Sequence, residues 1–350
     1  MDDIQRLRAW SYSRQKLGEP ARTLAQALDA VVAVYATHPT APLALWARAS
    51  SFTPARYRRF DRDRKGVRLP AMRRTVFLVS RKSAPRVFSA VRASPAHALR
   101  PLKVAKLSPK QYEAHAKKIL RAAKKPLSRK ELEEVVGIKG TELGPVLRAL
   151  RYEGRLLTLA GDSLMMSPHQ FVAASAWLEE GLDIGDADGA LVWLAGEYLK
   201  GYGPARVADF AWWTGVTKTA AQKAFEPHDT VDIGDGLLLP STDERAFGQL
   251  KPLRGAITLL PKWDSYTMGL APDGRQRFVH PDVQKRVYTP IGTGLPGDGN
   301  PVVLIDGEVV ATWTFSVKEG ADVQPFDKLG AKAIKSVDAK LSEIASLLSS

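Results

Sequence analysis

The sequence predicts an α+β fold made of repeated helical units, and three observations support this prediction. A run of capped, amphipathic helices followed by a β-hairpin pattern recurs three times before residue 250. Beyond residue 255 the apolar residues alternate as they do in β-strands. Residues 326–348 then return to helical spacing. We therefore expect three tandem winged helix-turn-helix units, followed by a small C-terminal β-barrel-like domain and a terminal helix.

The first unit is expected to span residues 1–100 and to end in a hairpin. Thr23 and Gln26 have the spacing of a capping box, and Thr53-Pro54 has the form of a capped helix start with proline in the first turn. Alternating apolar residues follow Gly66. We expect helices at residues 1–20, 23–36, 43–48 and 53–65, and a two-stranded hairpin at residues 67–79.

The second and third units are expected at residues 101–170 and 171–250. Ser108 is a helix cap, and Ser128 and Glu131 form a second capping box. A linker rich in proline and lysine precedes the second unit at residues 94–109. We expect helices at residues 108–123, 131–136 and 140–153 with a hairpin at 155–166, then helices at 187–200, 204–213 and 217–225 with a hairpin at 230–240.

The C-terminal region, residues 251–350, is expected to form the β-barrel-like domain with its terminal helix. Asp306-Gly307 is a strong signal for a two-residue hairpin turn. The loop at residues 289–300 is long and rich in glycine, so we expect it or its adjoining hairpin to face a binding partner rather than the terminal helix. Strands are expected at residues 256–260, 276–280, 301–306 and 308–317.

The composition favours a soluble cytoplasmic protein that binds a polyanion. The chain has no cysteine, which excludes disulfides, thiolate chemistry and a cysteine-rich zinc site. No apolar run approaches the ~18 residues that span a bilayer. A formal charge of +14 attracts polyanions, of which nucleic acid is the commonest in the cytoplasm. We expect no metal or cofactor, because no metal-ligand spacing relates His97, His115, His169, His228 and His280.

Two basic stretches are candidate nucleic-acid contacts. Residues 53–65 are dense in arginine, and residues 100–130 contain 11 lysines or arginines and a single glutamate. A solvated lysine face is the alternative interpretation of the second stretch. The candidate DNA-binding residues are Arg56, Arg58, Arg59, Arg62, Arg73, Arg74, Lys117, Lys118, Lys124 and Lys125.

A proline-bounded turn within residues 31–42 carries the candidate catalytic side chains. Tyr35, Thr37 and His38 follow an apolar run, and Pro39 restricts the backbone beside them. Polar groups held on a rigid backbone can bind or activate a reacting molecule. The alternative interpretation is an ordinary helix C-terminus with polar caps.

Four separated segments carry a resemblance to a known family: Ala41-Pro42 through Arg48, Arg68 to Leu78, Gly201 to Gly215, and Leu259 to Tyr266 with Val302 to Gly307. On these segments the chain resembles the AlkZ/YcaQ family of tandem winged-helix DNA glycosylases, and they follow one another in the right order. The resemblance implies three winged helices around duplex DNA and a C-terminal β-barrel-like domain. It also implies hydrolysis of the glycosidic bond of bulky alkylated purines, including N7-alkylguanines and crosslinks left by natural-product genotoxins.

The departure from this family falls at the proline-bounded turn. Characterised members carry Gln-x-Gln or Gln-x-Asp just before a Pro-x-Ala-Pro motif, which is here Pro39-Thr40-Ala41-Pro42, and the two catalytic positions match Tyr35 and Thr37. We expect Thr37 and His38 to hold and activate a water, with activity falling as pH drops through an imidazole pKa near ~6.5. Tyr35 would line the pocket or stack on the damaged base. Asp264 is an alternative base or a structural hydrogen-bond acceptor.

Two functions follow from this sequence. The first is a monofunctional DNA glycosylase for bulky N-alkylpurines, acting in DNA repair or antibiotic self-resistance as a monomer associated with the nucleoid. Its partner would be double-stranded DNA with bulky alkyl adducts. The second is a non-enzymatic DNA-binding protein, such as a regulator or lesion-shielding factor. The missing Gln-x-Gln favours the second function, whereas the retained prolines and polar triplet favour the first.

Overall fold

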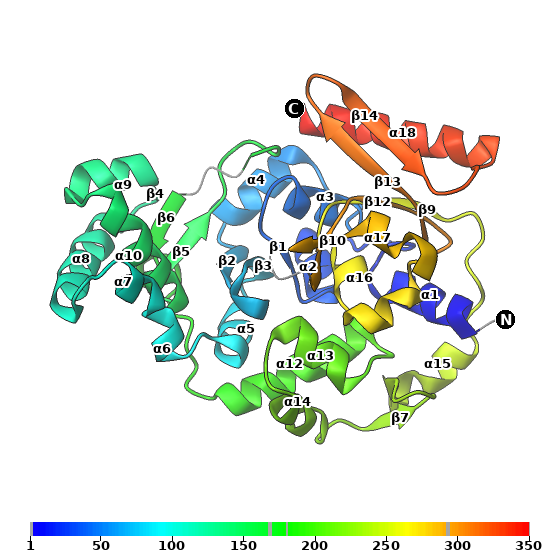
Figure 1. Cartoon of the computed structure of the whole chain (residues 1–350), viewed down its shortest axis with the longest axis horizontal. Helices are drawn as coiled ribbons and strands as arrows, with labels where there is room; N and C mark the ends of the chain where they lie inside the picture. Colours follow the sequence, from blue (N-terminus) through cyan, green and yellow to red (C-terminus); the bar gives the residue numbers. More distant parts are fainter. Residues whose placement is uncertain (1–2, 167–169, 180, 292–294, 350) are drawn as a thin grey trace.

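A computed structural model describes residues 3–166, 170–179, 181–291 and 295–349, and shows the predicted mixture of helices and strands (Figure 1). The helices of residues 95–152 form a lobe on the left of the view, and those of residues 187–225 lie below its centre. Residues 302–348 form a layer of strands and one helix at the upper right. None of the helices in these described ranges is long and apolar enough to cross a membrane.

The first helices and hairpin lie close to their predicted positions. The Thr23 side chain accepts a hydrogen bond from the Gln26 N–H, and the Thr53 side chain accepts one from the Arg56 N–H, so both predicted N-caps are confirmed, the capping box at Thr23 in its first half. The elements are α1 (Asp3–Arg14), α2 (Leu24–Ala30), α3 (Thr40–Trp46), α4 (Pro54–Arg62), β2 (Gly66–Pro70), the 3-10 turn η1 (Met72–Arg74), β3 (Val76–Ser80) and α5 (Ala84–Val91).

The prediction that the second helix runs to residue 36 is wrong. Helix α2 ends at Ala30, Val32 has a positive φ of 63°, and Ala33–Tyr35 forms strand β1. This strand pairs antiparallel with β3, with Val34 opposite Leu78. The β-branched valines pack better on a pleated, buried sheet than on a helix. The candidate catalytic turn therefore follows an edge strand rather than a helix.

The second unit also matches its predicted helices. Both halves of the capping boxes at Ser108 and Ser128 are present. The predicted linker at residues 94–109 is wrong in part, because a Ser94 cap starts a first short helix and a second follows. The elements are α6 (Pro95–Ala98), α7 (Arg100–Val104), α8 (Pro109–Ala122), β4 (Leu127–Ser128), α9 (Arg129–Val136), α10 (Gly140–Tyr152), β5 (Leu156–Leu159), β6 (Gln170–Ala173) and α11 (Ala174–Trp177).

The predicted hairpin at residues 155–166 is wrong in its second strand, because β5 pairs with β6 instead. Two residues after β5 contact the first unit: Arg58 Nε donates to the Asp162 carbonyl at 2.6 Å, and the His38 ring contacts the Ser163 carbonyl at 2.8 Å. The two hairpins then join into one sheet of order β1-β3-β2-β5-β6-β4, through the pairing of Arg68 with Thr158. The sequence did not predict this shared sheet.

The third unit has the predicted order of three helices and a hairpin. Gly215, with φ of 83°, ends the second helix in the left-handed conformation that glycine adopts without strain. The elements are α12 (Ala187–Tyr202), α13 (Val207–Thr214), α14 (Lys218–Phe225), β7 (Thr230–Asp232), β8 (Leu238–Pro240), the 3-10 turn η2 (Ser241–Asp243) and α15 (Glu244–Gly248).

The C-terminal region forms an open sheet of order β14-β13-β12-β9, and the strands in the described part of the chain do not close into the predicted barrel. The terminal helix packs on this sheet through Val337, Leu341 and Ile344. The elements are β9 (Ile257–Leu260), α16 (Ser265–Met268), the 3-10 turns η3 (Pro272–Arg277) and η4 (Pro281–Val283), α17 (Gln284–Val287), β10 (Tyr288–Ile291), β11 (Leu295–Gly299), β12 (Val302–Ile305), β13 (Glu308–Ser316), β14 (Gly320–Pro325) and α18 (Ala331–Leu348).

The predicted loop at residues 289–300 is mostly a β-hairpin. Strand β10 pairs antiparallel with β11, with Tyr288 opposite Gly299. The Tyr288 hydroxyl donates to the Thr267 carbonyl at 2.8 Å and anchors the base of the hairpin. Residues 292–294 of this predicted loop lie outside the described residues.

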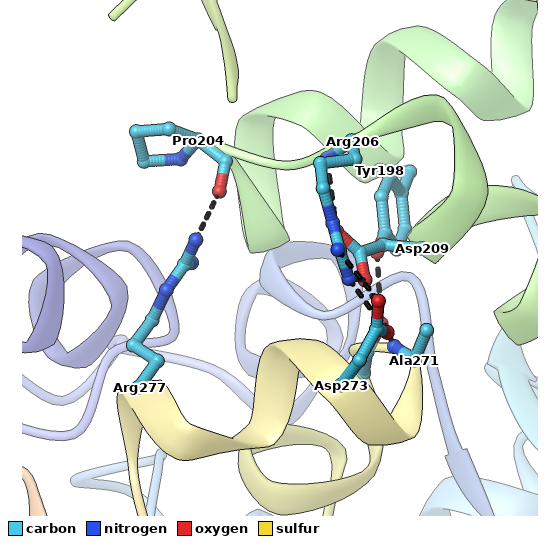
Figure 2. A network of polar contacts seen from close by, with 8 residues as sticks. Tyr198, Pro204, Arg206, Asp209, Ala271, Asp273 and Arg277 are labelled. Atoms are coloured by element: carbon cyan, nitrogen blue, oxygen red, sulfur yellow. Dashed lines mark hydrogen bonds and ion pairs between the residues drawn. The ribbon is translucent and has the colours of Figure 1, made fainter. Parts of the chain in front are cut away.

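A polar network replaces the strand predicted at residues 276–280 and joins the third unit to the C-terminal region (Figure 2). Arg206 donates to both carboxylate oxygens of Asp209 at 2.9 and 3.0 Å and to both of Asp273 at 2.8 Å. The buried Arg277 donates to the Pro204 carbonyl at 2.6 Å. These bonds hold η3 against the start of α13, so that the segment is tied to a helix rather than paired in a sheet.

Candidate functional site

A cavity of about 400 Å³ lies beside the proline-bounded turn. Its walls come from strand β1 and the turn after it, the hairpin of the first unit, strand β5 of the second unit and the C-terminal region. Two aromatic rings, two arginines and three threonines are among its lining residues. The cavity is lined by Tyr35, Ala36, Thr37, Arg68, Arg74, Thr75, Val76, Thr158, Ala160, Trp263 and Gly297.

Tyr35 and Trp263 form an aromatic wall of this cavity. Their ring centroids lie 5.6 Å apart with planes inclined by 32°, and Phe77 packs behind Tyr35 at 4.4 Å. Arg73 Nη2 donates to the Tyr35 hydroxyl at 3.2 Å, which fixes the ring. Trp263 has a positive φ of 57°, which is uncommon for a bulky residue and indicates a position held by its surroundings. Such a wall can stack on a planar base.

Thr37 is the exposed hydroxyl at the mouth of the cavity. It lies in the bend between β1 and α3, and the Ala36 carbonyl beside it accepts a hydrogen bond from Arg68 Nη1 at 2.7 Å. Arg68 also bonds Asp61 Oδ2 at 2.9 Å and is 3% exposed. The backbone next to Thr37 is therefore tied to a buried ion pair of the first unit.

His38 takes part in a network that faces the second unit instead of the cavity lining. Its Nδ1 lies 2.8 Å from the Ser163 carbonyl and 3.2 Å from that of Met166, and its Nε2 lies 2.8 Å from the Tyr57 hydroxyl. Because the two carbonyls at Nδ1 can only accept, the proton of the neutral ring lies on Nδ1, and Nε2 accepts from the Tyr57 hydroxyl, whose oxygen accepts from Arg68 Nη2. Burial, and next the charge of Arg68, lower the pKa of His38 to about 4.

The lowered pKa of His38 predicts how stability depends on pH. The pKa of this imidazole is near 6.5 in the unfolded chain and about 4 in the folded protein. The neutral ring therefore stabilises the fold above pH 6.5, and this contribution to the free energy of unfolding is lost as pH falls toward 4. The shift corresponds to about 3 kcal/mol. Chemical denaturation at pH 7 and pH 4.5 should show a larger loss for wild type than for His38→Gln. Equal losses of stability in the two proteins would contradict the lowered pKa of His38. Because the folded ring stays neutral at pH 6.5, the activity expected from the sequence should show no inflection near that pH.

Asp264 is held in a buried ion pair away from the cavity. Its two oxygens accept from Arg48 at 2.6 and 2.8 Å, and both side chains have 0% exposure. One oxygen also accepts from the Tyr266 N–H at 2.9 Å and caps α16. Both carboxylate oxygens are thus used within the fold, and this geometry favours the structural role over that of a base.

The arginines of α4 point to two different places. Arg58 and Arg62 both bind Asp162 of the second unit, through its carbonyl and its carboxylate respectively. Arg56 and Arg59 instead line a separate cavity of about 600 Å³ on another part of the helix. Its other basic lining residues are Arg22 and Lys65. The helix therefore does not present all its cations to one surface.

The remaining candidate basic residues lie at three places. The Arg73 guanidinium lies 3.9 Å from the centroid of the Trp212 ring, while Arg74 is exposed at the cavity. The four candidate lysines are all exposed, on α8 and in the turn after it: Lys117, Lys118, Lys124 and Lys125. Within the described ranges, no three histidine, aspartate or glutamate side chains come together in a way that could hold a metal ion.

Most of the lining residues were missed as site residues by reasoning from sequence, among them Trp263, Arg68 and Thr158. Trp263 and Arg68 belong to segments that carry the family resemblance, so a search of those segments could have found them. Thr158 had no local signal, because it reaches the cavity only through the pairing of β5 with β2.

Comparison with known proteins identifies the family. A family model described as DNA glycosylase AlkZ-like matches residues 28–347. The solved structure of Streptomyces sahachiroi DNA glycosylase AlkZ matches with a TM-score of 0.79 at 22% identity, over 98% of this chain and 96% of that chain. At this identity the likeness shows a shared fold. No curated protein matches the chain. Because the family model covers most of its length, the chain belongs to the AlkZ-like DNA glycosylase family.

Proposed function

We propose that this protein is a monofunctional DNA glycosylase that hydrolyses the N-glycosidic bond of bulky N-alkylated purines. N7-alkylguanine adducts or crosslinks from natural-product genotoxins are the expected substrates, in repair or self-resistance. The observation that carries the proposal is the cavity that joins Thr37 to the wall of Tyr35 and Trp263. We expect the protein to act as a monomer at the nucleoid in the cytoplasm, with its helix-and-hairpin units serving as winged helices on duplex DNA.

The chemistry needs little more than a positioned water. An N7-alkylguanine is cationic, so it leaves without protonation by an acid. The water oxygen bonds to C1′, the C1′–N9 bond breaks, and its electron pair leaves with the base, which becomes neutral. The surplus proton of the water passes to solvent. The cavity suits this step, because Thr37 supplies a hydroxyl at its mouth that can hold the water.

The cations at the cavity fit a nucleotide better than an isolated base. Arg68 is neutralised by Asp61 at 2.9 Å, so its charge does not repel a cationic base strongly. Arg74 is exposed at the same cavity and is free to approach a phosphate of the damaged strand. We infer that the aromatic wall takes the base and Arg74 the backbone.

DNA binding is expected to weaken steeply with salt, log K falling by roughly 0.9 per neutralised phosphate for each tenfold rise in salt. Lys117→Gln with Lys118→Gln should reduce that slope by up to roughly 1.8 if both lysines neutralise phosphate. A matched control changes the exposed Lys332 and Lys335 of α18, which we place away from DNA. Equal salt slopes for the α8 double variant and the α18 control variant would contradict this binding mode, and so would strong selection of one undamaged sequence.

One experiment tests the activity. Purified protein is incubated with duplex DNA carrying a defined N7-guanine adduct, beside the same DNA without protein, and released base is measured by mass spectrometry. Release well above the spontaneous rate is the expected result.

A non-enzymatic DNA-binding protein is the second candidate, and the residues at the turn favour it. Tyr35 and Thr37 stand where characterised members have glutamine or aspartate, while the nitrogens of His38 and the oxygens of Asp264 are used in other bonds. The same incubation separates the two functions. Tight binding of damaged DNA without release of base would support a regulator or lesion-shielding factor.

A further inference from the structure

Thr158 is a buried hydroxyl on the inner wall of the cavity. It lies in the middle of strand β5 and is 1% exposed. Its neighbours Leu157 and Leu159 belong to the hydrophobic core, and side chains alternate along a strand. Thr158 therefore faces away from that cluster, on the face that it shares with Leu156 of a second core cluster and with Ala160 of the cavity lining.

Thr158 lies between two cross-strand partners, Phe171 of β6 and Arg68 of β2, and Arg68 lines the same cavity. Residues directly opposite in an antiparallel pair project from the same face. The three guanidinium nitrogens of Arg68 already bind Asp61, the Ala36 carbonyl and the Tyr57 hydroxyl. All three guanidinium nitrogens of Arg68 are therefore used within the first unit, and none of them donates to the Thr158 hydroxyl.

The Thr158 hydroxyl makes no hydrogen bond to any residue that the structure describes. Buried polar groups are nearly always paired, so one that lines a cavity without a protein partner indicates a ligand. Thr75 provides a contrast, because its hydroxyl already donates to the Met72 carbonyl at 3.1 Å. A side chain with 1% exposure admits only a very small ligand.

We propose that the Thr158 hydroxyl binds the water molecule that attacks C1′, at the inner wall of the cavity, while Thr37 contacts the substrate side. The assignment rests on the proposed glycosylase function. Water is the smallest available ligand and the second substrate of the hydrolysis. A threonine hydroxyl can accept a hydrogen bond from it and donate one in return, so that an oxygen lone pair is oriented toward the sugar.

Thr158→Val tests the proposal, because valine keeps the shape of threonine and removes the hydroxyl. We expect the single-turnover rate of base release to fall by about 10- to 100-fold, as for loss of a group that positions the nucleophile. The Kd for damaged DNA should not change, and the Tm should stay equal or rise because an unpaired polar group is gone. Thr158→Ser should retain most of the rate, because it keeps the hydroxyl.

The outcomes separate this proposal from the proposed function. A wild-type protein that releases no base overturns both. An active wild type with an equally active Thr158→Val variant overturns the water site alone. A variant whose rate and Tm fall together, with no rescue by serine, shows that Thr158 serves packing and also overturns the water site.

Discussion

Asp264→Ala is expected to lower the free energy of unfolding by about 3–5 kcal/mol, the cost of leaving one charge of a buried pair without its partner. Arg48 and Asp264 are both fully buried and joined by two bonds of 2.6 and 2.8 Å. Among the described residues, removing the carboxylate leaves the guanidinium with the Ala44 carbonyl and the Gln15 side chain as its hydrogen-bond partners. It also removes the cap of α16. Urea denaturation of the two proteins at pH 7 measures the difference.

A double variant serves as the control for this prediction. Arg48→Met with Asp264→Leu removes both charges and keeps apolar volume, so much of the lost stability should return. The contrary result would be an Asp264→Ala protein as stable as wild type that releases no base. Such a protein would show that Asp264 is the base, as one reading of the sequence allowed.

The local signals in the sequence predicted helices well, because a capping box depends on residues three apart. Ser128 and Glu131 form both of its bonds, and Ser108 caps α8 as expected. The strand Ala33–Tyr35 was missed for the opposite reason. Its pairing with residues 77–79 is set far along the chain, and an apolar run of valines fits a buried helix equally well before that partner is known.

The candidate site shows the same limit. Tyr35 and Thr37 could be placed from the family resemblance, since they lie in one short segment, and both line the cavity. Asp264 looked available because nothing near it in the sequence reveals a partner, yet Arg48 binds it from 216 residues away. Thr158 reaches the cavity only because two hairpins share a sheet. Sequence reasoning therefore found the residues of the turn and missed those that other units bring to it.

Thr37→Ala is expected to reduce base release by about 10- to 1000-fold while DNA affinity and Tm barely change. Thr37 is exposed at the cavity mouth, so its loss removes a hydroxyl from the site without opening a hole in the core. Thr37→Ser is the matched control, because it keeps the hydroxyl. Single-turnover excision, the Kd for damaged DNA and Tm should be measured on the same preparations. Full activity in Thr37→Ala would remove the turn from the mechanism.

His38→Ala should give a different pattern, and the contrast identifies the role of each residue. Its ring satisfies the buried Tyr57 hydroxyl and a carbonyl of the loop at residues 163–166, so its loss leaves polar groups unpaired and should cost about 1–3 kcal/mol of stability. Base release measured well below the Tm should fall less than in Thr37→Ala, since the ring acts by holding Tyr57, Arg68 and the turn in place. A stable His38→Ala protein with the larger loss of rate would instead make the imidazole the general base. Because Nε2 accepts from Tyr57, that outcome would require Tyr57 to turn away when DNA binds, and Tyr57→Phe should then leave the rate of base release unchanged.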